Sequence, residues 1–163
     1  MGKVPELFVP TVCLLAQKLN RGLYAIRGTA SLVLQGLDFN VSDIDVICDK
    51  DTALLCNVLL NEFVVSPVIY SESSKFKSYF GKFKVNGLDV EIYGDWQIKD
   101  SKGEWSKVFD GNERKELSLN NTSTYVTTID SELFMYMFMQ RWNVYHKIKR
   151  ELEQLNSPQL GLF

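Results

Sequence analysis

The chain of 163 residues is long enough for one domain with a substantial buried core, so we expect a single domain over residues 1–163. Hydrophobic residues at 45% and charged residues at 23% are ordinary for a globular protein. A net charge of −2 argues against a protein that coats polyanions through its overall charge.

No apolar run approaches the roughly 18 residues that a membrane span requires, and no signal peptide is visible near Met1. We therefore expect a cytoplasmic protein without a membrane partner. Cys13, Cys48 and Cys56 lie in apolar stretches without CxxC spacing, which favours reduced, buried thiols.

The first elements in the chain are a predicted helix over residues 6–20, kinked or opened by Pro10, and a short buried strand over residues 23–27. Gly28 and Thr29 can then turn the chain into a short helix over residues 30–36. The free N–H groups at the start of such a helix, at the positive end of its dipole, favour an anion.

A second strand around residues 43–47 carries two carboxylates. Because side chains alternate along a strand, Asp43 and Asp45 project from one face and Ile44 and Val46 from the other. Two such Cβ atoms are roughly 7 Å apart, so both carboxylates can reach one Mg²⁺ or flank a pair of metal ions. A phosphate-binding turn facing two metal-binding carboxylates is typical of phosphoryl- or nucleotidyl-transfer sites.

A second helix is predicted over residues 51–63, with Asp51 as its N-cap. After a short strand around residues 68–70, Asn86-Gly87 indicates a β-hairpin between strands 76–85 and 88–93. Its first strand carries lysines at positions 77, 82 and 84, preceded by Lys75, which favours a solvated edge over a substrate-facing patch. Its second strand places Asp89, Glu91 and Tyr93 on one face. Either acid could be the third carboxylate of a metal site.

The region from 95 to 128 has little pattern beyond a possible strand at 105–109, a polar loop at 110–116 and β-prone residues at 124–128. Residues 131–155 are predicted to form one long helix. Its aromatic and methionine side chains suggest burial on more than one face, inside the domain or in a homodimer. Strands and helices in this order favour an α/β (α+β) fold with a mixed sheet, flanking helices and a long C-terminal helix.

These motifs resemble the signature of the nucleotidyltransferase superfamily, which includes DNA polymerase β, poly(A) polymerase and antibiotic-modifying enzymes. The resemblance covers most of the chain and is closest to small, largely uncharacterised bacterial and archaeal members. It is carried by RGTASLVLQG, SDIDV, SYFG, VEIYGD and the aromatic-rich terminal helix with Arg141. The departure is Thr29, which stands where the superfamily has Ser or Gly but keeps a hydroxyl.

The resemblance implies a nucleotidyltransferase-like fold and the transfer of a nucleoside monophosphate from a nucleoside triphosphate, ATP first, to a hydroxyl acceptor. It implies that Asp43, Asp45 and Glu91 are catalytic and hold Mg²⁺ or Mn²⁺, with Asp89 as the alternative to Glu91. It also implies that Gly28, Thr29 and Arg141 bind the nucleotide, although Arg141 could equally form a surface ion pair. The acceptor stays open among protein, small molecule and RNA.

Two other classes of function fit the same residues. One is a catalytically inactive module that binds a nucleotide or a partner on the same fold. The other is an interaction protein that uses its aromatic terminal helix and forms an oligomer. Pyrophosphate release that depends on a metal separates the enzyme from both.

Overall fold

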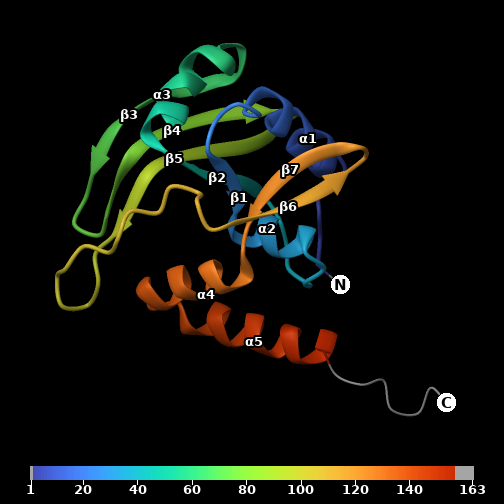
Figure 1. The fold of residues 1–163 in the computed structure, drawn as a ribbon, viewed down its shortest axis with the longest axis vertical. Coiled ribbons are helices and arrows are strands. Elements are labelled where there is room, and N and C mark those ends of the chain that lie inside the picture. The colour runs from blue at the N-terminus through green and yellow to red at the C-terminus, as the bar shows by residue number, and fades with distance from the viewer. Residues whose placement is uncertain (1, 157–163) are drawn as a thin grey trace.

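The computed structural model of the chain describes residues 2–156, and their strands form one seven-stranded mixed sheet (Figure 1). The order across the sheet is β3-β4-β5-β2-β1-β7-β6. The strands are β1 (Tyr24–Arg27), β2 (Asp43–Cys48), β3 (Val64–Glu72), β4 (Phe76–Val85), β5 (Leu88–Ile98), β6 (Arg114–Leu119) and β7 (Thr122–Thr127). The helices are α1 (Phe8–Lys18), α2 (Gly28–Leu34), α3 (Lys50–Leu59), α4 (Ile129–Phe138) and α5 (Trp142–Asn156), with a 3₁₀ turn at Asn61–Phe63. The predicted mixed α/β class is confirmed.

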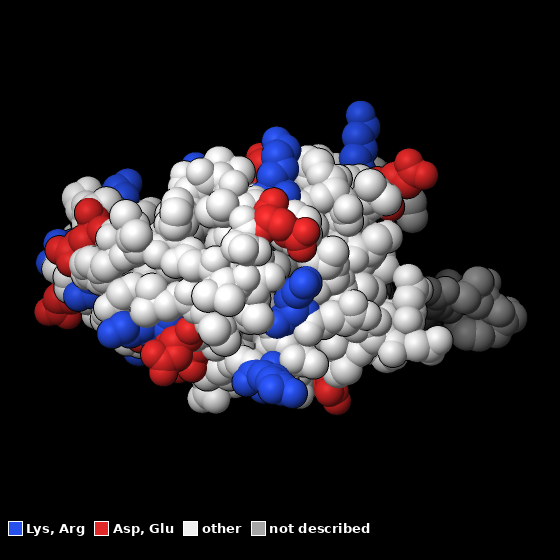
Figure 2. Space-filling model, turned by 90° about the horizontal axis from the view of Figure 1, so that it is seen from above, with Lys and Arg blue, Asp and Glu red and all other residues white. Residues whose placement is uncertain are grey.

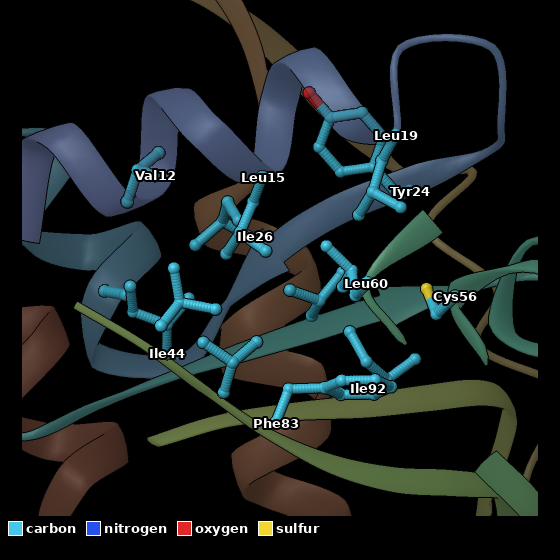
Figure 3. Packing of buried hydrophobic residues seen from close by; sticks show 14 of the residues in the cluster. Val12, Leu15, Leu19, Tyr24, Ile26, Ile44, Cys56, Leu60, Phe83 and Ile92 are labelled. Carbon is cyan, nitrogen blue, oxygen red and sulfur yellow. The ribbon is translucent and has the colours of Figure 1, made fainter. Parts of the chain in front are cut away.

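One face of the sheet is covered by α1 and α3, and the main hydrophobic core lies between them and the strands. Figure 3 shows Val12 and Leu15 of α1, and Leu19 just after its end, above strand residues such as Ile26 and Ile44. Each fully buried aliphatic side chain of this kind contributes about 1.5–3 kcal/mol to folding. Because side chains alternate along a strand, the residues between these core positions point to the opposite face of the sheet.

The opposite face carries a smaller core under α4, in which Met135 packs with Ala25, Ile47, Trp96 and Ile98. Farther along, α2, α4 and α5 share a third cluster that includes Leu32, Leu133 and Ile148. In Figure 1 these three helices gather at one end of the sheet, away from α1 and α3. This second face therefore holds the polar side chains of the central strands in a partly covered space.

The helix ends differ in detail from the sequence prediction. Helix α1 begins at Phe8, so Pro10 lies in its first turn, where a missing N–H costs nothing. The N-cap of α3 is Asp49, whose side chain accepts a hydrogen bond from the Thr52 N–H, and the prediction of Asp51 was wrong. Helix α2 begins at Gly28, two residues before its predicted start.

The predicted single helix over residues 131–155 is two helices, which corrects the expectation of one long C-terminal helix. Gln140 has a φ of +58°, outside the helical region, and ends α4. The N–H of Gln140 donates to the Met137 carbonyl, and the N–H of Arg141 donates to the Tyr136 carbonyl. These bonds are the Schellman pattern, which usually has glycine at the left-handed position. Because glutamine stands there, the sequence does not signal the break.

The hairpin at Asn86-Gly87 is confirmed, with φ values of +53° and +79° that suit a type I′ turn. Strand β4, however, lies between β3 and β5, so its lysines do not form the predicted edge of the sheet. The edge strand on this side of the sheet is β3, which is longer than the strand predicted at 68–70. Residues 105–109 contribute two isolated bridges in place of the predicted strand, and β6 replaces part of the predicted loop at 110–116.

Acidic and basic side chains are interspersed on the surface that Figure 2 shows, and neither sign gathers into a large field there. This distribution agrees with the small net charge of the chain. None of the helices within residues 2–156 combines the length and the apolar character needed to cross a membrane.

Candidate active site

The three central strands bring the predicted carboxylates together. Strand β5 runs parallel to β2, with Asp45 opposite Glu91 and Asp43 opposite Asp89. Strand β1 runs antiparallel to β2 and places Arg27 opposite Asp45. Because side chains alternate along each strand, these residues share the face that α4 partly covers.

Asp43, Asp45 and Glu91 each offer a carboxylate oxygen, and these three atoms lie within 4.8 Å of one another. All three residues are half-buried. Asp89 is outside this cluster: its exposed carboxylate pairs with Lys84 at 3.3 Å. Of the two acids that the sequence left open, the fold therefore brings Glu91 into the cluster.

The carboxylate of Asp45 is strongly perturbed by its surroundings. Burial raises the pKa of Asp45 to about 7, against the opposing effect of Arg27 and with a further increase from Asp43 and Glu91. Its Oδ1 atom is buried and has no hydrogen-bond partner among the described residues. Burial, followed by the neighbouring Glu91, also raises the pKa of Asp43.

Arg27 is the functional-site residue that the sequence analysis missed. Its guanidinium is 3.6 Å from Asp45 and donates to the Oε1 atom of buried Glu132 at 3.3 Å. Thr127 donates to the other Glu132 oxygen at 2.6 Å. Burial is the largest single influence and lowers the pKa of Arg27, but Glu132, Tyr136, Asp45 and Tyr93 together raise it by more, so the net pKa is raised. The available signal was a charge at the end of an otherwise apolar strand.

Tyr93 and Trp96 form the next part of this face along β5. The Tyr93 hydroxyl donates to Oε2 of Glu91 at 2.7 Å, which orients that carboxylate. Asp95 has a φ of +48°, and the β4–β5 register shifts beside it, between Lys77 and Tyr79. A bulge of this kind changes which residues face each side. The bulge therefore brings Trp96 to the same side of the sheet as Tyr93, and their ring centroids are 5.5 Å apart. The Trp96 ring centroid is also 4.9 Å from the Cζ atom of Arg27.

The predicted nucleotide-binding turn lies next to Asp45. Gly28 has a φ of +71°, which favours glycine, and a Cβ atom there would be 3.5 Å from Asp45 Oδ2. Thr29 follows it in the first turn of α2 and is half-buried. The turn thus leaves its backbone close to the carboxylate cluster, as the sequence predicts.

Arg141 reaches the same region from the junction of α4 and α5. We call the adjacent cavity of about 370 Å³ the site cleft. It is lined by Arg27, Asp45, Ser71, Ser73, Phe76, Ser78, Phe80, Tyr93, Trp96, Met139 and Arg141. Arg141 forms no ion pair with any described residue, and its guanidinium carbon lies 5.5 Å from the centroid of the Tyr136 ring.

The carboxylate cluster fits a divalent cation. Three carboxylates are the hard oxygen ligands that Mg²⁺ and Mn²⁺ prefer. A bound cation would also give the buried Oδ1 atom of Asp45 the partner that it lacks among residues 2–156. Arg27 holds that side chain from the opposite side, because its Nη1 atom contacts Oδ2.

No protein-family model matches the chain, and no curated protein does either. Similarity is found among solved structures. A protein from Thermotoga maritima described as a "putative nucleotidyltransferase" is similar with a TM-score of 0.78 and 22% identity, over 94% of this chain and 97% of that one. An antigenic nucleotidyltransferase-like protein from Paracoccidioides brasiliensis is similar with a TM-score of 0.50 and 18% identity, over 93% of this chain and 76% of that one. The chain therefore has a nucleotidyltransferase-like fold.

Proposed function

We propose that this protein is a metal-dependent nucleotidyltransferase that transfers a nucleoside monophosphate from a nucleoside triphosphate to a hydroxyl acceptor. ATP is the expected donor, and pyrophosphate is the second product. The observation that carries the proposal is the cluster of Asp43, Asp45 and Glu91 beside the Gly28 turn. Carboxylates beside a glycine turn suit a metal-bound triphosphate.

Asp43, Asp45 and Glu91 would hold Mg²⁺ or Mn²⁺. The ion would neutralise charge on the phosphates. Gly28 and Thr29 would bind the β- and γ-phosphates through backbone N–H groups, and the guanidinium of Arg141 would bind phosphate oxygens in a bidentate manner. Positioning and charge neutralisation supply most of the catalysis in phosphoryl-transfer reactions, so a rigid site on the central strands suits this chemistry.

In the reaction, the acceptor hydroxyl oxygen attacks the α-phosphorus in line and forms a new O–P bond. The bond from the α-phosphorus to the bridging oxygen breaks, and pyrophosphate leaves with that electron pair. The hydroxyl proton passes to Glu91, whose carboxylate is oriented by Tyr93, and then to solvent.

The substitution Asp45→Asn tests this assignment. It removes a metal ligand but keeps the size of the side chain, so we expect a folded protein in which Mn²⁺-dependent binding of a non-hydrolysable ATP analogue falls by at least about 100-fold. Asp89→Asn is the matched control, since Asp89 lies outside the cluster, and should bind as the wild type does. Metal-dependent binding retained in folded Asp45→Asn would refute the assignment. Pyrophosphate release then distinguishes an enzyme from a non-catalytic binding module.

A further inference from the structure

A second cavity adjoins the site cleft, and we call it the outer cleft. Its volume is about 640 Å³, and it shares Phe76, Met139 and Arg141 with the site cleft. The remaining lining residues are Ser74, Lys75, Ile98, Lys99, Asp100, Ser101, Gly103, Phe138 and Gln140. A transferase needs room for an acceptor as well as a donor, and this cleft opens next to the site cleft that Asp45 lines.

The outer cleft has an excess of positive charge. Lys75, Lys99 and Arg141 come from three separate segments, and the Lys99 N–H donates to the Lys75 carbonyl at 2.8 Å, which keeps the first two adjacent. Within residues 2–156, none of the three forms an ion pair. The acid in the lining is Asp100, and its Oδ1 atom already accepts hydrogen bonds from two backbone N–H groups of its own turn, at 2.9 Å each.

Aromatic rings line the passage from the carboxylates to these cations. Tyr93 and Trp96 are 5.5 Å apart between centroids, and Trp96 is stacked on Phe76 at 5.9 Å with an interplanar angle of 26°. Phe76 is 38% exposed and lines both clefts. Exposed ring surface at the junction can stack on a planar group of a ligand.

We propose that the outer cleft binds the acceptor, and that the acceptor is a small molecule with a planar ring and a phosphomonoester group. Lys75 and Lys99 match the two charges of a phosphate dianion, and Phe76 matches the ring, while Arg141 lines both clefts and is assigned to the donor. A nucleic-acid polymer fits less well, because such proteins use long basic surfaces, whereas this chain has a net charge of −2 and a bounded cleft.

This inference rests on the proposed function for the reaction that follows binding. The acceptor hydroxyl would extend from the ring past Phe76 toward Glu91 and attack the α-phosphorus of the donor. The acceptor would keep its own phosphomonoester and gain the nucleoside monophosphate through its hydroxyl oxygen, while pyrophosphate leaves and the proton passes to Glu91.

The test separates the ring from the anionic group by titrating the full chain with phenyl phosphate, phenol and inorganic phosphate. Metal and nucleotide are left out, so the measurement does not depend on the carboxylate site. We expect saturable binding of phenyl phosphate, detected by calorimetry, about tenfold tighter than that of either fragment.

Variants assign the binding to the cleft. Lys75→Gln combined with Lys99→Gln should weaken phenyl phosphate binding by at least about tenfold, because two charged donors are lost. Phe76→Leu should weaken phenyl phosphate binding and leave inorganic phosphate unchanged. Lys115→Gln is the control, since Lys115 is exposed on β6, at the opposite edge of the sheet.

Unchanged binding in the double lysine variant would overturn the proposal, as would phenyl phosphate binding no tighter than inorganic phosphate. Tighter binding of a short oligouridylate, lost in the same variant, would also overturn it and assign the cleft to single-stranded nucleic acid. The Asp45→Asn variant should still bind phenyl phosphate. In the unsubstituted protein, absence of metal-dependent nucleotide binding with phenyl phosphate binding intact would refute the proposed function. Absence of phenyl phosphate binding with nucleotide binding intact would refute the acceptor site.

Discussion

At the scale of single residues, the candidate site contains a buried cationic side chain that neutralises neighbouring carboxylates. Arg27 lies between Asp45 and Glu132, and Glu132 has no exposed surface. Its second oxygen is satisfied by Thr127. The buried carboxylate of Glu132 would be strongly unfavourable without a cationic side chain beside it. Arg27 therefore stabilises the fold as well as the position of Asp45.

Arg27→Met should therefore lower the free energy of unfolding by about 3–5 kcal/mol, because it leaves Glu132 buried and unpaired. Urea denaturation at neutral pH measures the change. Lys107→Gln breaks the exposed pair with Glu113 and should cost less than about 1 kcal/mol. Equal effects of the two substitutions would contradict the role given to Arg27.

The raised pKa of Asp45 makes cation binding depend on pH. A divalent cation binds the ionised carboxylate, and Asp45, with a pKa of about 7 before the cation binds, is increasingly protonated below that pH. We expect the apparent affinity for Mn²⁺ to fall about tenfold for each pH unit below about 7 and to level off above about 8. Calorimetric titrations across this range measure it. An affinity independent of pH down to about 5 would contradict the electrostatic account of the site.

At the scale of elements, the break between α4 and α5 positions Arg141 where the two clefts meet. The break holds Gln140 in the left-handed region, at a φ of +58°. This conformation costs roughly 1–2 kcal/mol for a residue other than glycine. The Schellman hydrogen bonds and the packing of both helices offset that cost.

Gln140→Gly should raise the free energy of unfolding by about 1 kcal/mol, because glycine adopts this conformation without the steric cost. Thermal denaturation shows the effect as a higher Tm. Gln140→Val, with a branched side chain, should lower the Tm. A lower Tm in Gln140→Gly would contradict this expectation. It would mean that contacts of the glutamine side chain stabilise the fold by more than its left-handed backbone conformation destabilises it.

These elements also mark the limit of what the sequence predicts. The period-2 pattern around Asp43 and Asp45, and the turn residues Asn86 and Gly87, are local signals, and the fold agrees with them. The helix break occurs at Gln140, which has no turn preference, and the bulge at Asp95 lies inside a stretch that otherwise reads as one strand. Tertiary packing fixes both.

The candidate site shows the same division. The period-2 pattern and the family resemblance place Asp43, Asp45 and Glu91 on one face, but the sequence does not choose between Glu91 and Asp89. That choice needs the strand register and the Asp89–Lys84 pair. Arg27 and Glu132 are 105 positions apart, and no local pattern pairs residues at that distance.

At the scale of the whole molecule, one face of the sheet supplies stability and the other supplies the candidate chemistry. The main core lies under α1 and α3, whereas the carboxylates, Arg27 and both clefts lie on the side of α4. The nucleotidyltransferase-like fold accounts for this arrangement, but a fold alone does not establish an activity. The predicted homodimer through the terminal helices stays a prediction, with Trp142 46% exposed on α5.

The central claim is that the carboxylate face binds a nucleoside triphosphate through a divalent cation. The most direct measurement is a calorimetric titration of the full chain with non-hydrolysable analogues of the four nucleoside triphosphates, with and without Mg²⁺ or Mn²⁺. We predict saturable binding that requires the cation, with the ATP analogue bound most tightly. A folded protein that binds none of the four in the presence of either cation would contradict the claim.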